Sequence, residues 1–183
     1  MAQVASSFGS SKNILIAPSI NLANAAFSAV TALGPSGSSA VGTISASLAS
    51  CRISSVNLFI NVTGLQSAQS SIWPFTVYFF SAAPTINGTA AWAWLYAWNS
   101  SYLGSISLIG TSNAQTGATG SVYSSILGFG SGTQPGIGGQ PLDVVFSPGT
   151  TLNNLYFVVV TNYATAALGA SAAMILSLNV STL

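Results

Sequence analysis

Four side chains in this 183-residue sequence belong to the types that most often do chemistry: Lys12, Arg52, Asp143 and the thiol of Cys51. Asp143 is the only carboxylate side chain, and the chain has no His. A general acid–base pair needs two titratable groups, and glycosidases use two carboxylates. Metal centres usually draw on three or more Cys, His, Asp or Glu ligands. We therefore expect no catalytic residues, no metal site and no cofactor.

The two cationic side chains also argue against nucleic acid as a partner. Affinity for nucleic acid grows with the number of phosphates that Lys and Arg neutralise, and this chain offers two such residues. Asp143 lies between Leu142 and Val144, so we expect it to be a buried partner of Arg52 with a structural role. The lone Cys51 is expected to be a small buried apolar residue.

Charged residues make up 2% of the chain, whereas an ordinary globular domain has about 25%. Stability depends on pH only through groups that titrate, so such a chain should tolerate strong acid. A compositional bias of the host is the alternative explanation. A net charge of +1 also leaves little repulsion between copies. The composition predicts that the chain associates with itself, as a homo-oligomer, lattice or filament.

Short apolar segments separated by clusters of Gly, Pro, Ser and Asn predict an all-β fold, an antiparallel two-sheet sandwich. The most strongly apolar run, residues 155–160, is far shorter than the ~20 residues of a transmembrane helix, so no span is expected. Residues 1–12 are predicted to be an N-terminal arm and residues 13–183 a single domain. The expected strands, of which eight or nine should form the core, are residues 13–20, 25–32, 41–48, 53–62, 72–81, 91–98, 102–109, 122–127, 142–146, 155–162 and 172–180.

Two of these segments, residues 75–80 and 155–160, are continuously apolar instead of alternating. Strands that are buried on both faces show this pattern. We therefore predict that they are central strands, covered by the second sheet and by further protein, either in the same chain or in a neighbouring subunit. Residues 21–33 are the only stretch that also fits a short helix, because Ala is frequent there and Asn21 or Asn24 could cap it.

Four aromatic residues alternate in the expected strand 91–98 and would share one of its faces. Three interpretations remain open: core packing between sheets, a subunit interface, or a platform for carbohydrate or lipid. The candidate interface residues are Trp92, Trp94, Tyr96 and Trp98.

Asn87 is the most accessible candidate for glycosylation, because it starts an Asn-Gly-Thr sequon in an expected turn. The chain has four such sequons, which is about the number that its Asn, Ser and Thr content gives by chance. The sequence therefore contains a possible glycosylation site, but the number of sequons is no evidence that the site is used.

The order of these features resembles the single jelly-roll coat proteins of icosahedral viruses. The shared features are a polar arm over residues 1–12, about eight strands, and a C-terminal part with a strong strand over 155–162 and an alternating one over 174–180. The scarcity of charge resembles virion proteins of viruses from hot acidic springs, whose hosts are archaea. The resemblance implies a jelly roll, located in the virion, that assembles with itself and with other virion proteins into a shell stable in acid and heat.

An extracellular archaeal filament, or pilus, is the alternative function. In such filaments a strand from one copy can complete the sheet of the next, a mode called donor-strand complementation. The donor would lie in residues 13–20, with Ile14, Leu15 and Ile16 as its apolar side chains. The N-terminus shows no apolar stretch of the length that a secretory signal needs, which counts against this alternative unless the chain is already processed.

Overall fold

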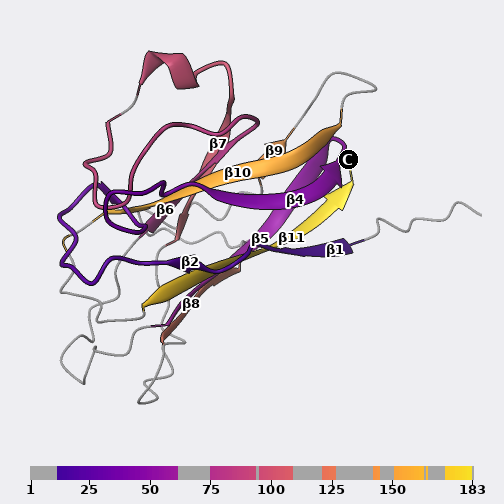
Figure 1. Cartoon of the computed structure of the whole chain (residues 1–183). Coiled ribbons are helices and arrows are strands. Elements are labelled where there is room, and N and C mark those ends of the chain that lie inside the picture. Colours follow the sequence, from indigo (N-terminus) through magenta and orange to yellow (C-terminus); the bar gives the residue numbers. More distant parts are fainter. Residues whose placement is uncertain are drawn as a thin grey trace, which may run out of the picture.

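Two antiparallel β-sheets, stacked face to face, form the protein (Figure 1). The computed structural model describes residues 12–61, 75–93, 95–108, 121–126, 142–144, 151–162, 164 and 172–182. Within these residues the only helical element is η1 (Tyr96–Trp98), a single 3-10 turn. The predicted all-β class and two-sheet sandwich are confirmed.

The first sheet has six strands, in the order β1-β11-β5-β8, with β2 also beside β11 and β9 also beside β5. The second has five, in the order β3-β10-β6-β7, with β4 also beside β10. The strands of the first sheet are β1 (Lys12–Ile16), β2 (Ile20–Asn21), β5 (Cys51–Asn61), β8 (Ser121–Ile126), β9 (Leu142–Val144) and β11 (Ala173–Thr182). Those of the second are β3 (Thr31–Ala32), β4 (Gly42–Leu48), β6 (Phe75–Phe80), β7 (Tyr102–Leu108) and β10 (Leu152–Thr161).

In three places two shorter strands lie end to end along the same long strand and occupy one position in the sheet. Each sheet therefore has four strand positions. β1 and β2 follow successive parts of β11, β3 and β4 follow successive parts of β10, and β9 and β8 follow successive parts of β5. The main pairings are nested along the chain: β1 with β11, β4 with β10, β5 with β8, and β6 with β7. Strands from the two ends of the chain therefore alternate within both sheets.

Nine of the expected strands coincide with observed ones, with bounds that shift by a few residues. The two that fail are 25–32, where only β3 forms, and 91–98. Residues 21–33 do not form a helix either. Phe27 is buried there, and the amides of Leu22 and Ala23 donate to the carbonyls of Ala172 and Gly34, so tertiary contacts take the place of helical hydrogen bonds. Residues 1–11 of the predicted arm lie outside the described residues, and Lys12 is the first residue of β1.

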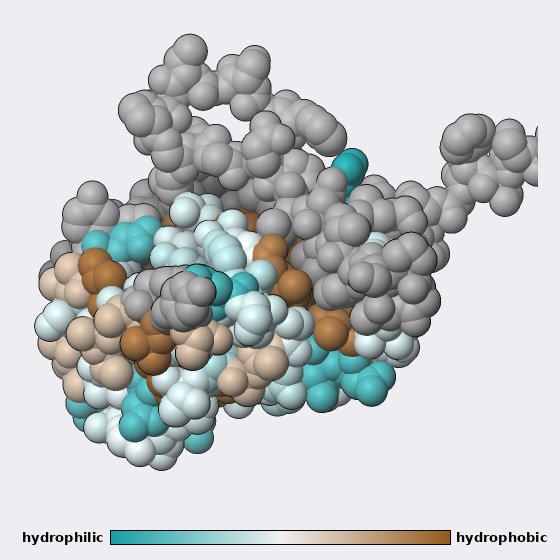
Figure 2. All heavy atoms as spheres, turned by 90° about the horizontal axis from the view of Figure 1, so that it is seen from above, coloured by the Kyte–Doolittle hydropathy of each residue, from teal (hydrophilic) through white to brown (hydrophobic). Residues whose placement is uncertain are grey.

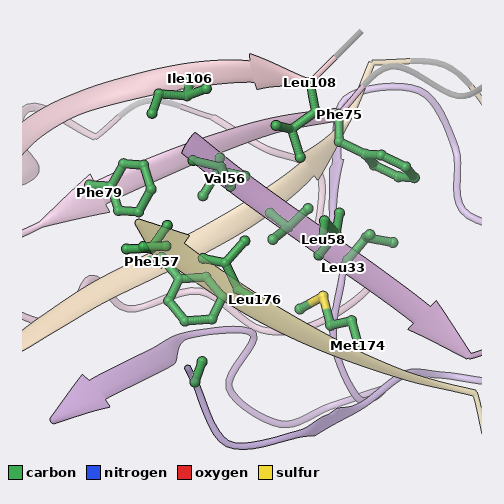
Figure 3. Close-up of a cluster of buried hydrophobic side chains, with 14 of the residues drawn as sticks. Leu33, Val56, Leu58, Phe75, Phe79, Ile106, Leu108, Phe157, Met174 and Leu176 are labelled. Carbon is green, nitrogen blue, oxygen red and sulfur yellow. The ribbon is translucent and has the colours of Figure 1, made fainter. Parts of the chain in front are cut away.

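The main core lies between the sheets, and Figure 3 shows its side chains meeting from both sides. Val56 and Leu58 of β5 and Leu176 of β11 come from the first sheet. Phe79 of β6 and Phe157 of β10 come from the second. Each is essentially inaccessible to solvent, and burial of a side chain of this size contributes about 1.5–3 kcal/mol. This core holds the two sheets together.

β6 and β10 are the two inner strands of the second sheet, as predicted from their continuous apolar runs. Alternate residues of β10, such as Phe157 and Val159, join the core between the sheets. Their neighbours Val158 and Val160, together with Phe80 of β6, are buried in a separate apolar cluster on the opposite face. The second sheet is therefore covered on both faces, and the cover on its outer face comes from the same chain.

Candidate interaction surfaces

The outer face of the second sheet is covered by residues 81–93 and 95–101, which we call the aromatic cap. In Figure 1 this segment arches over β10 and β6 on the side away from the first sheet. Its ends are tied together, because the Ser81 amide donates to the Ser101 carbonyl at 2.7 Å and the Ser81 hydroxyl donates to the same oxygen at 3.2 Å. Figure 2, which views this side of the molecule, shows several separate apolar areas among polar ones.

Backbone hydrogen bonds fasten the cap to the segment around β3. The Trp92 amide donates to the Val30 carbonyl at 2.8 Å, and the Ala32 amide donates to the Ala90 carbonyl at 3.0 Å. Gly34 and Gly88 also pack backbone against backbone, so closely that a Cβ on Gly88 would overlap the Gly34–Pro35 peptide. The cap is thus an integral layer of the fold.

Two β-branched residues in this region have left-handed backbone conformations, Val30 with φ of 56° and Thr89 with φ of 66°. β-branched residues adopt positive φ only under strain, at a cost of about 1–3 kcal/mol each. The Val30 amide donates to the Thr161 carbonyl of β10, and the Val30 carbonyl accepts the hydrogen bond from the Trp92 amide of the cap. The Thr89 amide donates to the Ala32 carbonyl, so each strained residue takes part in a hydrogen bond between the cap and the segment around β3.

Aromatic rings from the cap and from the sheet beneath it form one cluster. The ring centroids of Tyr78 and Trp92 are 4.4 Å apart, and those of Trp92 and Trp98 are 5.2 Å apart. Phe80 contacts Trp98 edge-on at 6.1 Å and Tyr102 at 5.9 Å. Offset and edge-on pairs of this kind contribute about 0.5–1.5 kcal/mol each beyond their buried area. The cluster therefore stabilises the contact between cap and sheet.

The structure does not form the strand expected over residues 91–98. After an isolated bridge at Ala91 the chain turns into η1, where the Trp98 amide donates to the Leu95 carbonyl at 2.9 Å. The two rings brought together, those of Trp92 and Trp98, are six positions apart instead of two. Tyr96 lies in η1 and Trp94 falls outside the described residues. The prediction that these aromatic residues share one face of a strand was therefore wrong. A role of this region in a subunit interface stays a prediction.

The exposure of the cap side chains separates a packing role from a binding role. Trp98 is buried, with 6% of its surface exposed, whereas Trp92 is half-buried. Leu95 is 48% exposed and belongs to neither apolar cluster. Trp98 packs within the chain, but between the cap and the outer face of the second sheet instead of between the two sheets. Leu95 remains available for contact with another molecule.

Burial in this cluster raises the pKa of the Tyr78 hydroxyl above its ordinary value. The nearby Tyr102 hydroxyl acts in the same direction, and a side-chain hydrogen bond with Trp92 lowers the pKa in part. The sequence pattern did not single out Tyr78, although its place in a continuously apolar strand indicated that both faces of that strand are buried.

The segment that could act as a donor strand is β1, which pairs with β11 of its own chain. Leu15 packs against the core, and Ile14 and Ile16 on the opposite face are 69% and 65% exposed. In the described residues no other strand pairs with β1, so it forms the edge of the first sheet. Donation of this strand to another copy stays a prediction.

All three charged residues of the sequence lie in one row across the first sheet. Lys12 of β1 is opposite Ser181 of β11, Ser181 is opposite Arg52 of β5, and Arg52 is opposite Asp143 of β9. The register thus places Arg52 and Asp143 as direct neighbours, where the sequence predicts a pair. No sequence signal could reveal the row, because it depends on pairing between distant strands. Cys51 is a buried thiol, as expected.

The other predicted features have simple structural settings. Asn87 is exposed, so its sequon is accessible, and glycosylation stays a prediction. No three His, Cys, Asp or Glu side chains come together within the described part of the chain. Within the same part, no helix has the length and apolar character needed to cross a membrane.

Comparison with protein-family models, with curated proteins and with solved structures finds no match to this chain. Its function therefore has to be inferred from the fold, the composition and the surfaces described above.

Replacing Trp98 with Ala should lower the free energy of unfolding by about 3–5 kcal/mol, because it removes a large buried ring and leaves a cavity. Chemical denaturation followed by tryptophan fluorescence and circular dichroism measures this loss. Leu95→Ala, three positions away and exposed, is the matched control and should change stability by less than about 0.5 kcal/mol. Equal losses from the two variants would contradict the packing role of Trp98.

Alkaline pH should destabilise the fold through Tyr78. Its pKa is raised in the folded state, so above pH ~10 the unfolded chain loses the proton first and stability falls as the pH rises towards the folded pKa. Tyr78→Phe should flatten the dependence of the denaturation midpoint on pH above ~10. Near pH ~7, where Tyr78 does not titrate, the slope of the midpoint against pH should be the same in the variant and the original protein. An unchanged alkaline slope in Tyr78→Phe would show that Tyr78 is not the group responsible.

Proposed function

We propose that the chain is a structural, non-enzymatic subunit that assembles into the shell of a virion and has a single jelly-roll fold. The nested strand pairing carries this proposal. A jelly roll has eight strands in two sheets linked as Greek keys. Taking β1, β4, β5, β6, β7, β8, β10 and β11 as those eight strands gives one sheet of the first, eighth, third and sixth, and another of the second, seventh, fourth and fifth.

This order is what results when one long antiparallel hairpin is rolled up. The first strand pairs with the last, the second with the second-last, and so on inward to the central hairpin of β6 and β7. Rolling then brings β5 beside β11 and β6 beside β10. The short strands β2, β3 and β9 extend three of the eight positions and leave the order unchanged.

The composition supports self-assembly of such a subunit and stability of the assembly in acid. With a net charge of +1, copies repel one another very little, and burial of surface between copies keeps a neutral, apolar chain from nonspecific aggregation. With one carboxylate side chain and no His, very little titrates between pH ~2 and 7, so acid removes few stabilising interactions. These properties suit a shell that protects its contents in hot acid, with other virion proteins as neighbours.

The filament alternative is favoured by one observation, the position of β1. This strand has five residues, lies at the edge of the first sheet, and contributes only Leu15 to the core among its described side chains. A strand with so few contacts is the easiest one to exchange between copies. A pilus subunit would then give β1 to the next copy and receive the same strand from the previous one.

Negative-stain electron microscopy of the full-length protein at pH ~3 and pH ~7 tests the proposal. We expect closed shells or ring-shaped capsomers at both pH values, and a light-scattering size that hardly changes between them. Long filaments at both pH values would support the pilus and contradict the shell. Dispersed monomers at both would contradict self-assembly altogether.

A further inference from the structure

The row of charged residues crosses the first sheet from one edge to the other. Lys12 lies on β1 at one edge, Asp143 lies on β9 at the other, and Ser181 and Arg52 occupy the two positions between them. The chain has no other charged side chain. Directly opposite residues of antiparallel strands share a face of the sheet, so the four positions lie on one face. One edge is thus marked by a cationic residue and the other by an anionic one.

Along each strand, alternate residues direct their backbone N–H and C=O groups to opposite sides, so one hydrogen bond shows which residues direct these groups outward at the edges of the sheet. The Ala17 amide donates to the Leu176 carbonyl at 2.8 Å, so Ala17, and by alternation Leu15, direct their backbone groups towards β11. Lys12, Ile14 and Ile16 therefore direct theirs away from the sheet. The same alternation, carried across four antiparallel positions, turns the amide and carbonyl of Asp143 outward at the far edge.

We propose that copies of this chain join edge to edge through the first sheet, with β1 of one copy beside β9 of the next and Lys12 opposite Asp143 of the neighbouring copy. This inference rests on the proposed self-assembling function and specifies its contact. In the described part of the chain the only strand that pairs with β1 is β11 and the only strand that pairs with β9 is β5, so each has one side without a paired strand.

Geometry and charge both favour this arrangement. The sheet has four positions, an even number, so a repeated copy keeps neighbouring strands antiparallel and keeps the hydrogen-bond alternation intact. The position of Asp143 would then lie between Arg52 of its own copy and Lys12 of the neighbour. Pairing of β1 with β1 about Ile14 would instead set Lys12 opposite Ile16, a charged residue against an apolar one.

The contact also accounts for the exposed apolar face of β1. Ile14 and Ile16, 69% and 65% exposed in the isolated chain, would gain neighbours from the adjoining sheet. Edge strands of soluble proteins are usually protected against pairing, often by lysine or proline. Here Lys12 and Pro18 bracket the two isoleucines, so a partner strand with a negative charge opposite Lys12 is favoured over one without it.

Such a contact is heterologous, because it joins two different edges of the same molecule. Repetition closes into a ring where the rotation between copies allows it and otherwise continues as an open helix. Ring-shaped capsomers and filaments are therefore both compatible with the contact. The microscopy described above tells them apart.

Cysteine cross-linking tests the contact in the full-length protein. Lys12→Cys and Asp143→Cys are made separately in a Cys51→Ala background, mixed and oxidised mildly. Opposite residues in an antiparallel pair have Cα atoms about 4.5–5.5 Å apart, within the range that a disulfide needs. We expect a mixed disulfide dimer. Ile16→Cys on the same strand is the control, and should cross-link to Asp143→Cys much less because four residues separate its position from the row.

Two cross-linking patterns would overturn the proposal. One is that Lys12→Cys joins to Ile16→Cys instead of to Asp143→Cys, which would indicate pairing of β1 with β1 about Ile14. The other is that Ile16→Cys cross-links to Asp143→Cys as well as Lys12→Cys does, which would indicate random collision. Shells or rings that form without the mixed disulfide would overturn this contact and leave the proposed function standing. A mixed dimer without any larger assembly would support this contact and overturn the proposed function.

A charge exchange supplies the second readout. Lys12→Glu and Asp143→Lys should each weaken self-association about 3- to 10-fold, because each replaces an attraction of up to about 1 kcal/mol with a repulsion. An equal mixture of the two variants should recover association, since the introduced glutamate of one copy would then face the introduced lysine of the other. Association in the mixture as weak as in either variant alone would show that the row acts within a single copy.

Circular dichroism and the denaturation midpoint of each variant show whether it has folded. If Asp143→Lys fails to fold beside Arg52, Asp143→Asn removes the charge more gently. It should weaken association of the otherwise unchanged chain, and mixing with Lys12→Glu should recover association in part, because Lys12 of one variant would face Asp143 of the other at every second contact. Association in this mixture as weak as in Lys12→Glu alone would contradict a charge-matched contact.

Discussion

The structure depends on burying both faces of two strands, β6 and β10. Both carry apolar residues on their two faces, so neither face tolerates water at low cost. The first sheet covers one face and forms the main core. The other face needs a second cover, which the aromatic cap supplies with Trp98, Trp92 and Ile86. The molecule is therefore built in three layers, with the second sheet in the middle.

This arrangement decides which surfaces remain for other molecules. The outer face of the second sheet is occupied by the cap, which is hydrogen-bonded to the segment around β3 through two strained residues, Thr89 of the cap and Val30 of that segment. Among the described residues no segment covers the outer face of the first sheet in this way, and Ile14, Ile16 and Ile175 are exposed there. Its two edges also carry the charged residues at the ends of the row. Contacts between copies are thus expected at the first sheet more than at the aromatic residues.

The sequence was sufficient to predict the fold class and most strands, because alternation and turn residues are local signals. It also identified β6 and β10 as central strands from their apolar runs. The prediction of a strand over residues 91–98 was wrong. Aromatic residues at every second position are compatible with a strand, but they are equally compatible with a segment that ends in a 3-10 turn and packs its rings on the sheet. The pairing order, the alignment of Lys12 with Asp143, and the cluster around Tyr78 arise from contacts between distant segments, so no local pattern encodes them.

Residue-resolved amide hydrogen exchange of the folded protein tests the central role of β6 and β10 most directly. If both faces of these strands are buried within one chain, the amides of Val158 and Val159 should exchange only through global unfolding and be among the slowest. Amides of the edge strand β1, such as Ile14 and Ile16, should exchange orders of magnitude faster in the unassembled protein. Exchange of Val158 as fast as that of Ile14 would contradict the three-layer structure and the surfaces derived from it.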